Sequence, residues 1–493
     1  MTEELSKYKY IFDFMCENVV IEEKGYLDKN VNQRTLSEMS FEMDRVFRSN
    51  NFRYSERGFM AFNGKIYIPI KNELIPSLVK EVLMAKDVAK LYIMEAPKKI
   101  ASGIILNKMN KTFIPSNEII SFNNGVLLFT PTGCEFHSHD EKWQTNKHFP
   151  IDYDDRATCP MWLDTLENIL PEVSLRMVLQ EYIGLALINR KELKVESALY
   201  LLGGGSNGKS VIYETVAGVM GLENICNYDF ASLCDTGNAG NYNRATADGK
   251  IINWCSDMSS DALKGTGLYK SIVSNEGVPA RAIGCDSYTS HDMPLLIANV
   301  NKFPSTIDHS DGFWRRALII PFQKHFAVND KNTDVELPFK LRAEYSGVFN
   351  WIIKGRERLI AQKGKFTKSE SIEITSIDVK NRSNTGYTFF SDLEYFPQAK
   401  SDGVYTDFLI SLDDFYQKYV DYCKQSSIYC KSRTLFKEDI AGYKFEKVRT
   451  NKGMRYKIFK LDYHYENIGL FSDEKSNDSD DDAQYRIEAE LPF

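Results

Sequence analysis

The sequence predicts an α/β protein in which a parallel sheet covered by helices forms the central domain. Two observations predict this fold class. Between residues 193 and 330, apolar strand-like runs alternate with helical stretches, and strands separated by helices favour a mostly parallel sheet with both faces covered. A glycine-rich loop also follows the first of these strands and precedes a helix. The expected strands are SALYLL, KIINWCS, PLLIANV and RALIIPF.

We expect an α+β domain before this sheet and a smaller module after it. Residues 1–118 mix helical patterns with short strand patterns such as KIYIPI. Residues 119–192 begin with a hairpin-like pair of strands and end in a helical collar. Residues 331–400 are expected to form a helical linker, and residues 401–465 a basic, aromatic module. Residues 466–493 are strongly acidic and cannot bury enough apolar surface to fold, so we expect a disordered tail.

Composition limits the classes of protein to consider. A chain of 493 residues with 43% hydrophobic and 26% charged residues is expected to form about three globular domains. The net charge of −7 gives no general attraction to nucleic acid, so a DNA-binding surface has to be a local patch. The nine cysteines are scattered and include no C-x-x-C pair, which argues against a zinc ribbon or a disulfide framework. We find no signal peptide and no uninterrupted apolar run of 18 residues, and therefore expect a soluble, intracellular protein without a membrane partner.

The glycine-rich loop within LLGGGSNGKS (residues 201–210) indicates a nucleotide site. It matches G-x-x-x-x-G-K-[ST] in full. The glycines let backbone N–H groups point at phosphate oxygens, and the following helix directs its positive end at the same anion. Lysine is expected to reach the β- and γ-phosphates and the last serine to hold Mg²⁺. The expected binding residues are Gly203, Gly204, Gly205, Ser206, Asn207, Gly208, Lys209 and Ser210.

Polar residues at the ends of the next strands fit the hydrolysis of that nucleotide. Asp257 follows the strand KIINWCS, where an acid holds Mg²⁺ and polarises water in such enzymes. Asn301 follows PLLIANV and suits the orientation of water against the γ-phosphate. Arg315 and Arg316 precede the strand ALIIPF. An arginine there suits a finger supplied to the nucleotide of a neighbouring subunit, which implies a ring.

The order and spacing of these elements resemble a superfamily 3 helicase of the phage and plasmid primase-helicase type, related to the poxvirus primase-helicase. Further motifs fit the same family. They are F-x-N-G-V at 122–126, C-P-x-W at 159–162, LQEYIGLALI before the loop, N-x-x-P at 301–304 and W-R-R at 314–316.

The resemblance implies an AAA+-like ATPase core that uses ATP and Mg²⁺ and assembles as a homo-hexamer. It also implies ATP-dependent unwinding of DNA during phage or mobile-element replication, in the cytoplasm of a bacterial host. In this comparison the loop residues form the first motif and Asp257 the second. Asn301 is the sensor, and Arg315 or Arg316 is the finger.

One departure concerns the second motif, where many members have an acidic pair. This chain has Ser256, Asp257 and Met258 there. Either Asp257 performs both roles, or Asp261 or Glu276 contributes, or hydrolysis is weak.

The segment between the second and third motifs resembles the one that holds a DNA-gripping hairpin in this family. The resemblance implies that Lys270 and Arg281, with His291 as a weaker candidate, contact phosphates in the central channel. The alternative is that these are ordinary surface charges on a solvated loop.

The C-terminal module has the pattern of a winged helix. Residues 424–460 contain eleven basic and three acidic residues interleaved with aromatics. Two helical stretches precede strand-like runs joined by an N-K-G turn, which indicates a hairpin wing. We expect contacts with single- or double-stranded DNA from Arg433, Lys437, Lys447, Arg449, Lys452 and Arg455. A solvated basic face or a role in subunit packing is the alternative.

The acidic tail ends in ELPF. It resembles the acidic C-terminal tip of bacterial single-stranded-DNA-binding proteins, so docking of a replication partner is one hypothesis and a solvated tail the other.

Two other functions fit the sequence. The chain could combine priming with unwinding, for which Asp152 and Asp154 are candidate metal ligands. It could also be an ATP-dependent initiator that binds and melts origin DNA without processive unwinding.

Overall fold

The protein is described here from a computed structural model. The structure describes residues 3–20, 33–55, 58–86, 90–106, 113, 116–130, 133–258, 265–303, 310–326, 334, 336–399, 404–426, 428 and 430–461. The chain divides into two compact units, residues 1–380 and 381–493, each considered by itself. Asp261, Pro304 and the predicted acidic tail lie outside the described residues.

The first part of the larger unit combines helices with a small antiparallel sheet of order β1-β2-β3. Its own apolar core includes Met43, Phe52 and Leu83. Tyr67 joins this part to the next, because its hydroxyl donates to the carbonyl of Glu141, 2.9 Å away. The elements are α1 (Glu3–Ser6), α2 (Lys9–Asn18), α3 (Gln33–Phe47), β1 (Phe52–Ser55), β2 (Gly58–Phe62), β3 (Tyr67–Ile70), η1 (Asn72–Leu74), α4 (Ile75–Ala85) and α5 (Lys90–Leu106).

A second antiparallel sheet follows. It consists of β4 (Ile119–Ser121), β5 (Val126–Thr130) and β6 (Gly133–His137) and leads to η2 (Glu141–Trp143). The register of β4 against β5 pairs Ser121 with Val126, which confirms the hairpin that the sequence predicts here.

The central sheet is parallel and has five strands. Its order is β13-β7-β12-β9-β8, so the chain leaves β7 for the far edge and returns to place its last strand on the other side of β7. That makes β7 the point where the strand order reverses, and ligands in open α/β sheets bind outside the carboxyl ends of strands at such a point. The strands are β7 (Ala198–Leu202), β8 (Ile225–Cys226), β9 (Ile252–Cys255), β12 (Leu295–Val300) and β13 (Ala317–Pro321).

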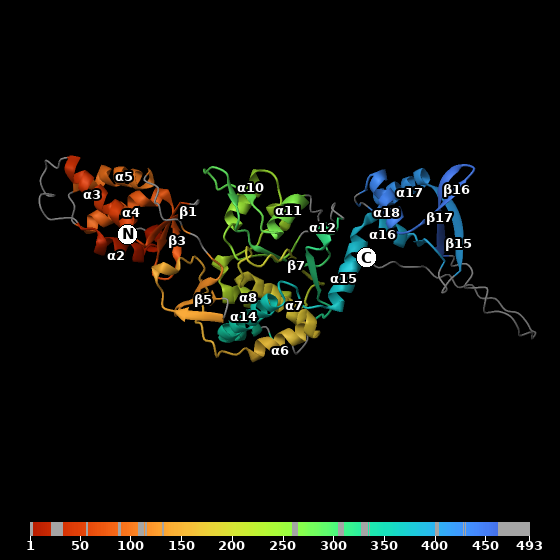
Figure 1. The fold of residues 1–493 in the computed structure, drawn as a ribbon, viewed down its shortest axis with the longest axis horizontal. Helices are drawn as coiled ribbons and strands as arrows, with labels where there is room; N and C mark the ends of the chain where they lie inside the picture. The colour runs from red at the N-terminus through yellow and green to blue at the C-terminus, as the bar shows by residue number, and fades with distance from the viewer. Residues whose placement is uncertain are drawn as a thin grey trace, which may run out of the picture. The chain divides into compact units, whose positions relative to one another are not determined.

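Successive side chains of β7 alternate between two cores, as a strand covered on both faces requires. Leu199 and Leu201 belong to the core shared with α7, α8 and α14. Ala198 and Tyr200 belong to the core shared with α9, α10 and α11. Figure 1 shows these two groups of helices on opposite sides of the sheet.

The helices of the first group, with their neighbours, are α6 (Pro160–Ile169), α7 (Val173–Gly184), η3 (Leu185–Leu187), α8 (Lys209–Met220), η4 (Leu222–Asn224), α13 (Leu337–Leu341), η5 (Arg342–Glu344) and α14 (Tyr345–Ala361). The elements of the second group, with the helix that ends the unit, are α9 (Phe230–Leu233), α10 (Asn238–Ala247), α11 (Thr266–Val273), β10 (Val278–Ala280), β11 (Tyr288–Ser290), α12 (Asp311–Trp314) and α15 (Glu370–Ser383).

The smaller unit is built around the aromatic side chains of Phe389, Phe415 and Phe436. Helix α16 belongs to this unit, because its Phe389 and Phe390 are buried in the aromatic core. The sequence analysis treats the segment that contains α16 as a helical linker. Its elements are α16 (Thr385–Asp392), β14 (Tyr395–Phe396), β15 (Tyr405–Ser411), α17 (Leu412–Gln425), α18 (Arg433–Gly442), β16 (Glu446–Thr450) and β17 (Gly453–Leu461).

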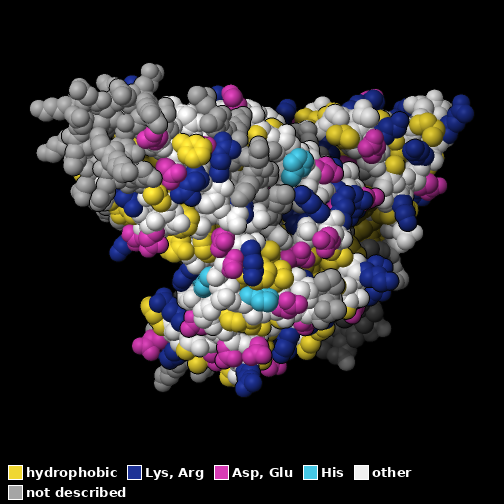
Figure 2. Space-filling view, turned by 60° about the vertical axis from the view of Figure 1, so that its left-hand side comes forward, with side chains coloured by type: hydrophobic (Ala, Val, Ile, Leu, Met, Phe, Trp, Pro, Cys, Tyr) yellow, Lys and Arg dark blue, Asp and Glu magenta, His cyan; other side chains and the backbone are white. Residues whose placement is uncertain are grey.

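Two general features of the surface and the helices bear on function. No helix among the described residues is long and apolar enough to cross a membrane. Basic and acidic side chains are intermixed over the face shown in Figure 2, which agrees with a net charge of only −7 for the whole chain.

Candidate nucleotide site

The glycine-rich loop connects β7 to α8 at the carboxyl edge of the central sheet. Its start is fixed to the neighbouring strand, because the Gly203 amide donates to the carbonyl of Val300, 3.0 Å away. Gly208 has φ of +85°, a conformation that favours glycine. A β-carbon at Gly203 would lie 2.4 Å from the carbonyl oxygen of Phe322, and one at Gly208 would lie 2.6 Å from Ile169. Gly203 and Gly208 are therefore required by the local geometry, whereas a β-carbon at Gly204 or Gly205 would meet no atom of the residues that the structure describes within 4 Å.

Lys209 is the first residue of α8 and is largely buried. Its Nζ donates to the carbonyl oxygens of Gly203 (2.7 Å) and Gly204 (3.1 Å), so the ammonium group lies inside the loop. Burial lowers the pKa of Lys209 from its usual value. An anion bound in the loop would replace the two neutral carbonyls with charged partners and favour the protonated form.

Asn207 provides a test of whether the loop fits a phosphate group. This side chain is buried, and its amide nitrogen has no hydrogen-bond partner in the described part of the chain. A buried donor without a partner costs about 1–3 kcal/mol, which an acceptor oxygen in the loop would recover. Ser210, next to Lys209 and exposed, has its hydroxyl available at the same edge. The loop therefore fits a phosphate group.

Asp257 and Asn301 lie near this loop through the register of the strands. Cys255 of β9 pairs with Ala298 of β12, and the amide of Met258 donates to the carbonyl of Asn299, 3.1 Å away. Asp257 therefore lies beside the end of β12. Asn301 directly follows Val300, whose carbonyl accepts the hydrogen bond from the amide of Gly203. Both side chains are exposed, and the sheet places them with the glycine-rich loop at one edge.

A second acid that the sequence analysis did not identify lies at the same edge. Asp229 follows β8, which pairs in parallel with β9. The pKa of Cys255 is raised to about 11, mainly by burial and in smaller part by the nearby carboxylates of Asp229 and Asp257. One side-chain oxygen of Asp229 accepts from the amide of Ala231 at 2.7 Å. The strand before Asp229 has only two residues, which is too short to recognise by periodicity.

Glu276, one of the alternatives for the missing acid, lies elsewhere in this chain. It closes the turn after α11, where its amide donates to the carbonyl of Ser271. Ser274 in the same turn accepts from Arg316, the residue just before β13. Glu276 is therefore at the amino edge of the sheet, opposite the glycine-rich loop.

The two arginines have different environments. Arg316 is buried and donates to Ser274, to the carbonyl of Gly312 and to Glu196 at 2.7 Å. The Arg315 side chain is 65% exposed, and its ion pair with Glu196, within the described part of the chain, is a weak one of 3.4 Å. Arg315 is therefore available at the surface, whereas Arg316 stabilises the fold.

The position of Arg315 excludes a role at the nucleotide site of its own chain. Ala317 pairs with Ala198, and Pro321 pairs with Leu202, so Arg315 precedes the amino end of the strand that the glycine-rich loop follows. The four residue steps from Ala198 to Leu202 span roughly 13 Å. The separation of Arg315 from the loop also includes the residues between each end of this span and the two sites. An arginine side chain is too short to bridge that separation.

The predicted channel residues are distributed over two elements. Arg281 follows β10 of the β10–β11 hairpin, and its Nε donates to the carbonyl of Cys285 within the hairpin loop, at 2.9 Å. His291 is exposed just after β11. Lys270 lies on α11 and donates to the hydroxyl of Ser310, 3.2 Å away. The exposed tip of this hairpin includes Ile283, which is 82% exposed.

In the smaller unit, the helix and the hairpin predicted to contact DNA are present as α18 and β16–β17. Arg433 forms an ion pair of 2.6 Å with Asp413, and Lys437 is exposed one turn later. Thr450 pairs with Gly453 at the predicted turn, in which Lys452 is exposed.

The wing cations do not share one face. The register pairs Lys447 with Tyr456 and Val448 with Arg455. Because residues opposite each other in an antiparallel pair point to the same side, Lys447 and Arg449 lie on one face and Arg455 on the other.

Comparison with known proteins gives two matching family profiles. One, described as "D5 N terminal like", matches residues 51–171, and the other, described as "Family of unknown function (DUF5906)", matches residues 201–316. Two proteins named "Putative primase C962R", from African swine fever virus isolate Tick/Malawi/Lil 20-1/1983 and strain Badajoz 1971 Vero-adapted, are each 24% identical over 215 residues. The alignments cover 42% of this chain and 22% of the viral proteins, so the chain spans about a fifth of the length of these relatives.

The resemblance to the phage and plasmid primase-helicases of superfamily 3 is confirmed. Among solved structures, "The A form apo structure of NrS-1 C terminal region-CTR" is similar with a TM-score of 0.45 and 12% identity, over 83% of this chain and 96% of that one. "SCCmec type IV Cch - active helicase" is similar with a TM-score of 0.39 and 13% identity, over 84% of this chain and 91% of that one.

Proposed function

We propose that this protein is an ATP-dependent DNA helicase that works as a homo-hexameric ring in phage or mobile-element replication. The observation that supports this most is the division of the catalytic residues between two edges of one sheet. Lys209, Asp257 and Asn301 lie at the carboxyl edge, whereas Arg315 is exposed at the amino edge. A site divided in this way is complete only when the arginine of one subunit meets the loop of the next.

ATP with Mg²⁺ is the proposed cofactor. Bound Mg²⁺ would neutralise charge on the phosphates and orient them for attack by water. The backbone amides of the glycine-rich loop and the ammonium of Lys209 hold the phosphates, and Ser210 with Asp257 holds the metal. Asn301 positions the attacking water. Asp229, near Asp257, is the candidate for the second acid that many members of the family have in the second motif.

In this proposal Arg315 acts as an arginine finger on the nucleotide of the neighbouring subunit, and subunits joined in this way form a ring. The parallel sheet core supports an AAA+-like arrangement, in which hydrolysis at one interface changes the relation between two subunits. In this proposal the β10–β11 hairpin with Arg281, together with Lys270, faces the channel and moves along the DNA backbone. The smaller unit, a winged-helix-like module, binds DNA through α18 and the β16–β17 wing. Contacts of this kind are to phosphates and are independent of sequence.

Mixing of variants tests this proposal. We expect Lys209→Ala and Arg315→Ala each to lose ATP hydrolysis stimulated by single-stranded DNA. An equimolar mixture should recover part of the activity, because one kind of interface combines an intact loop with an intact arginine. Failure of the mixture to recover any activity, with both variants still folded and assembled, would contradict the shared site.

Priming by the same chain is the second candidate, because the matched viral proteins are named primases. In the described residues no group of three or more His, Cys, Asp or Glu is arranged to hold a metal. Asp154 instead accepts from the amide of Arg156 in a turn. Synthesis of labelled primers on single-stranded DNA, compared between wild type and an Asp152→Ala/Asp154→Ala variant, tests this alternative.

A further inference from the structure

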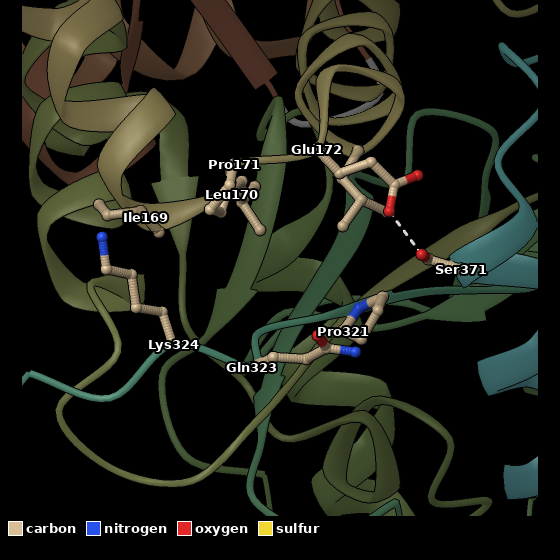
Figure 3. Close-up of a pocket in the computed structure, with 9 residues that line it drawn as sticks. Ile169, Leu170, Pro171, Glu172, Pro321, Gln323, Lys324 and Ser371 are labelled. Atoms are coloured by element: carbon tan, nitrogen blue, oxygen red, sulfur yellow. Dashed lines mark hydrogen bonds between the residues drawn. The ribbon is translucent and has the colours of Figure 1, made fainter.

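A cavity of about 340 Å³ lies between three segments that are far apart in the sequence. Figure 3 shows that the end of α6, the end of β13 and the start of α15 meet around it. Its volume is within the range of roughly 300–1,000 Å³ that is usual for small-molecule sites. The lining residues are Ile169, Leu170, Pro171, Glu172, Leu175, Pro321, Gln323, Lys324 and Ser371.

This cavity adjoins the glycine-rich loop on two sides. Ile169, in its wall, is the side chain against which Gly208 packs so closely that a β-carbon would lie 2.6 Å away. The segment that contains Gln323 and Lys324 continues along the loop. Directly after it, the His325 ring is hydrogen-bonded to the carbonyl of Gly205 at 3.0 Å, and the amide of Phe326 donates to the carbonyl of Ser206 at 2.7 Å.

The chemistry of the walls differs from that of the loop. The loop offers backbone amides and an ammonium group, which suit phosphates. The cavity offers the apolar surfaces of Leu170, Pro171 and Pro321, and beside them the amide of Gln323. A flat heterocycle is bound by apolar contact on its faces and by a few polar groups at its edge. The two adjoining sites therefore match the two halves of a nucleotide.

The outer rim of the cavity is a serine–glutamate cluster, here Glu172 with Ser369 and Ser371. The Ser369 hydroxyl donates to Glu172 at 3.0 Å, and the Ser371 hydroxyl donates to the other carboxylate oxygen (Figure 3). Hydrogen bonds from Ser174 and Ser371 hold the pKa of Glu172 below its usual value. Ser371 belongs to α15, the helix that ends the larger unit, so the cluster fixes the beginning of that helix to the cavity.

We propose that this cavity binds the nucleoside half of the nucleotide, and that its occupation stabilises the serine–glutamate cluster and thereby the start of α15. This inference rests on the proposed function, because it requires a nucleotide in the glycine-rich loop. It goes beyond that function in two ways. It assigns recognition of the nucleoside to the residues that line this cavity, and it couples nucleotide binding to α15, which leads into the smaller unit. Gln323 is the residue that reads the edge of the base.

Ligands that contain or lack the nucleoside test the proposal. We expect Mg-ATP to bind the full chain at least about tenfold more tightly than Mg-tripolyphosphate, since only ATP fills the cavity. Hydrogen exchange of the amides of residues 372–380 should slow with Mg-ATP and not with Mg-tripolyphosphate. If both ligands bind equally well and have the same effect on α15, the inference is wrong while the proposed function stands. If neither ligand binds, the proposed function itself fails.

Two variants make the test specific. Gln323→Trp places a large side chain at an exposed position of the cavity wall, and should reduce ATP affinity to that of tripolyphosphate without changing tripolyphosphate binding. Asp164→Trp, at an exposed position on α6 outside the cavity lining, is the matched control and should bind both ligands as wild type does. Unchanged ATP affinity in Gln323→Trp would overturn the assignment of the cavity.

Coupling to α15 is tested separately with Ser369→Ala/Ser371→Ala. This variant should still bind ATP within about threefold of wild type, because it leaves the apolar walls intact. Its α15 amides should no longer respond to Mg-ATP. An undiminished response of α15 in the double variant would show that the serine–glutamate cluster does not transmit the bound state.

Discussion

Replacement of Gly208 by alanine is the sharpest test of the glycine-rich loop. Gly208 has φ of +85° and ψ of 0°, a left-handed conformation that costs an L-residue about 1–2 kcal/mol. The new β-carbon would also lie 2.6 Å from two atoms of Ile169, and such overpacking costs about 1–3 kcal/mol. The two effects together predict a loss of about 2–5 kcal/mol in the free energy of unfolding, with loss of nucleotide binding because the loop must move.

Urea-induced unfolding, followed by the fluorescence of the buried Trp162 and Trp254, measures this change, and ATP titration measures binding. Gly204→Ala is the matched control, because a β-carbon there meets no atom of the described residues within 4 Å. We expect it to change stability by less than about 0.5 kcal/mol. Adding Ile169→Val to Gly208→Ala should recover part of the steric loss, since it removes one of the overlapping atoms. Equal stability of Gly208→Ala and Gly204→Ala would refute this account of the loop.

The environments of other side chains predict the effects of further substitutions and of pH. Arg316→Ala should destabilise the protein by about 2 kcal/mol or more, because it removes a buried set of hydrogen bonds. Arg315→Ala should change stability by less than about 0.5 kcal/mol while reducing kcat about 10³-fold; thermal unfolding and ATPase assays would contradict this if the two variants behaved alike. ATP affinity should fall as pH rises through the lowered pKa of Lys209. The free energy of unfolding should instead rise with pH between that pKa and the ordinary lysine pKa, since the unfolded chain binds the proton more tightly. An equal decline of ATP affinity with pH in Lys209→Arg would refute the role of the Lys209 ammonium group. Lys447→Ala/Arg449→Ala should reduce the salt dependence of DNA binding by about two phosphate contacts, and an unchanged slope would exclude these side chains from the interface.

The parallel sheet could be predicted because four of its strands are apolar runs of four to six residues that alternate with helices. β8 could not be predicted, since Ile225–Cys226 is too short to show periodicity. The sequence analysis begins the C-terminal module at residue 401, and the structure buries Phe389 and Phe390 of α16 in the core of the smaller unit. The sequence of an amphipathic helix does not reveal which core its aromatic side chains enter.

In the candidate site, too, residues within a contiguous motif could be predicted, and residues that only the fold brings together could not. Lys209 is specified by a contiguous motif, and a strand that ends in an acid indicates Asp257. Asp229 comes near Cys255, as Asp257 does, only through the pairing of β8 with β9. The cavity joins residues near 170, 322 and 371, and no pattern along the chain brings these together. Burial likewise distinguishes Arg315 from Arg316, which the sequence leaves as equivalent candidates.

The measurement that tests the central proposal most directly is unwinding of a forked DNA duplex with ATP and Mg²⁺ by the full chain. We predict that the wild-type protein separates the strands, and that Lys209→Ala and Arg315→Ala, which remain folded, do not. A wild-type protein that hydrolyses ATP on single-stranded DNA and separates no duplex would contradict the proposal that this chain is a helicase.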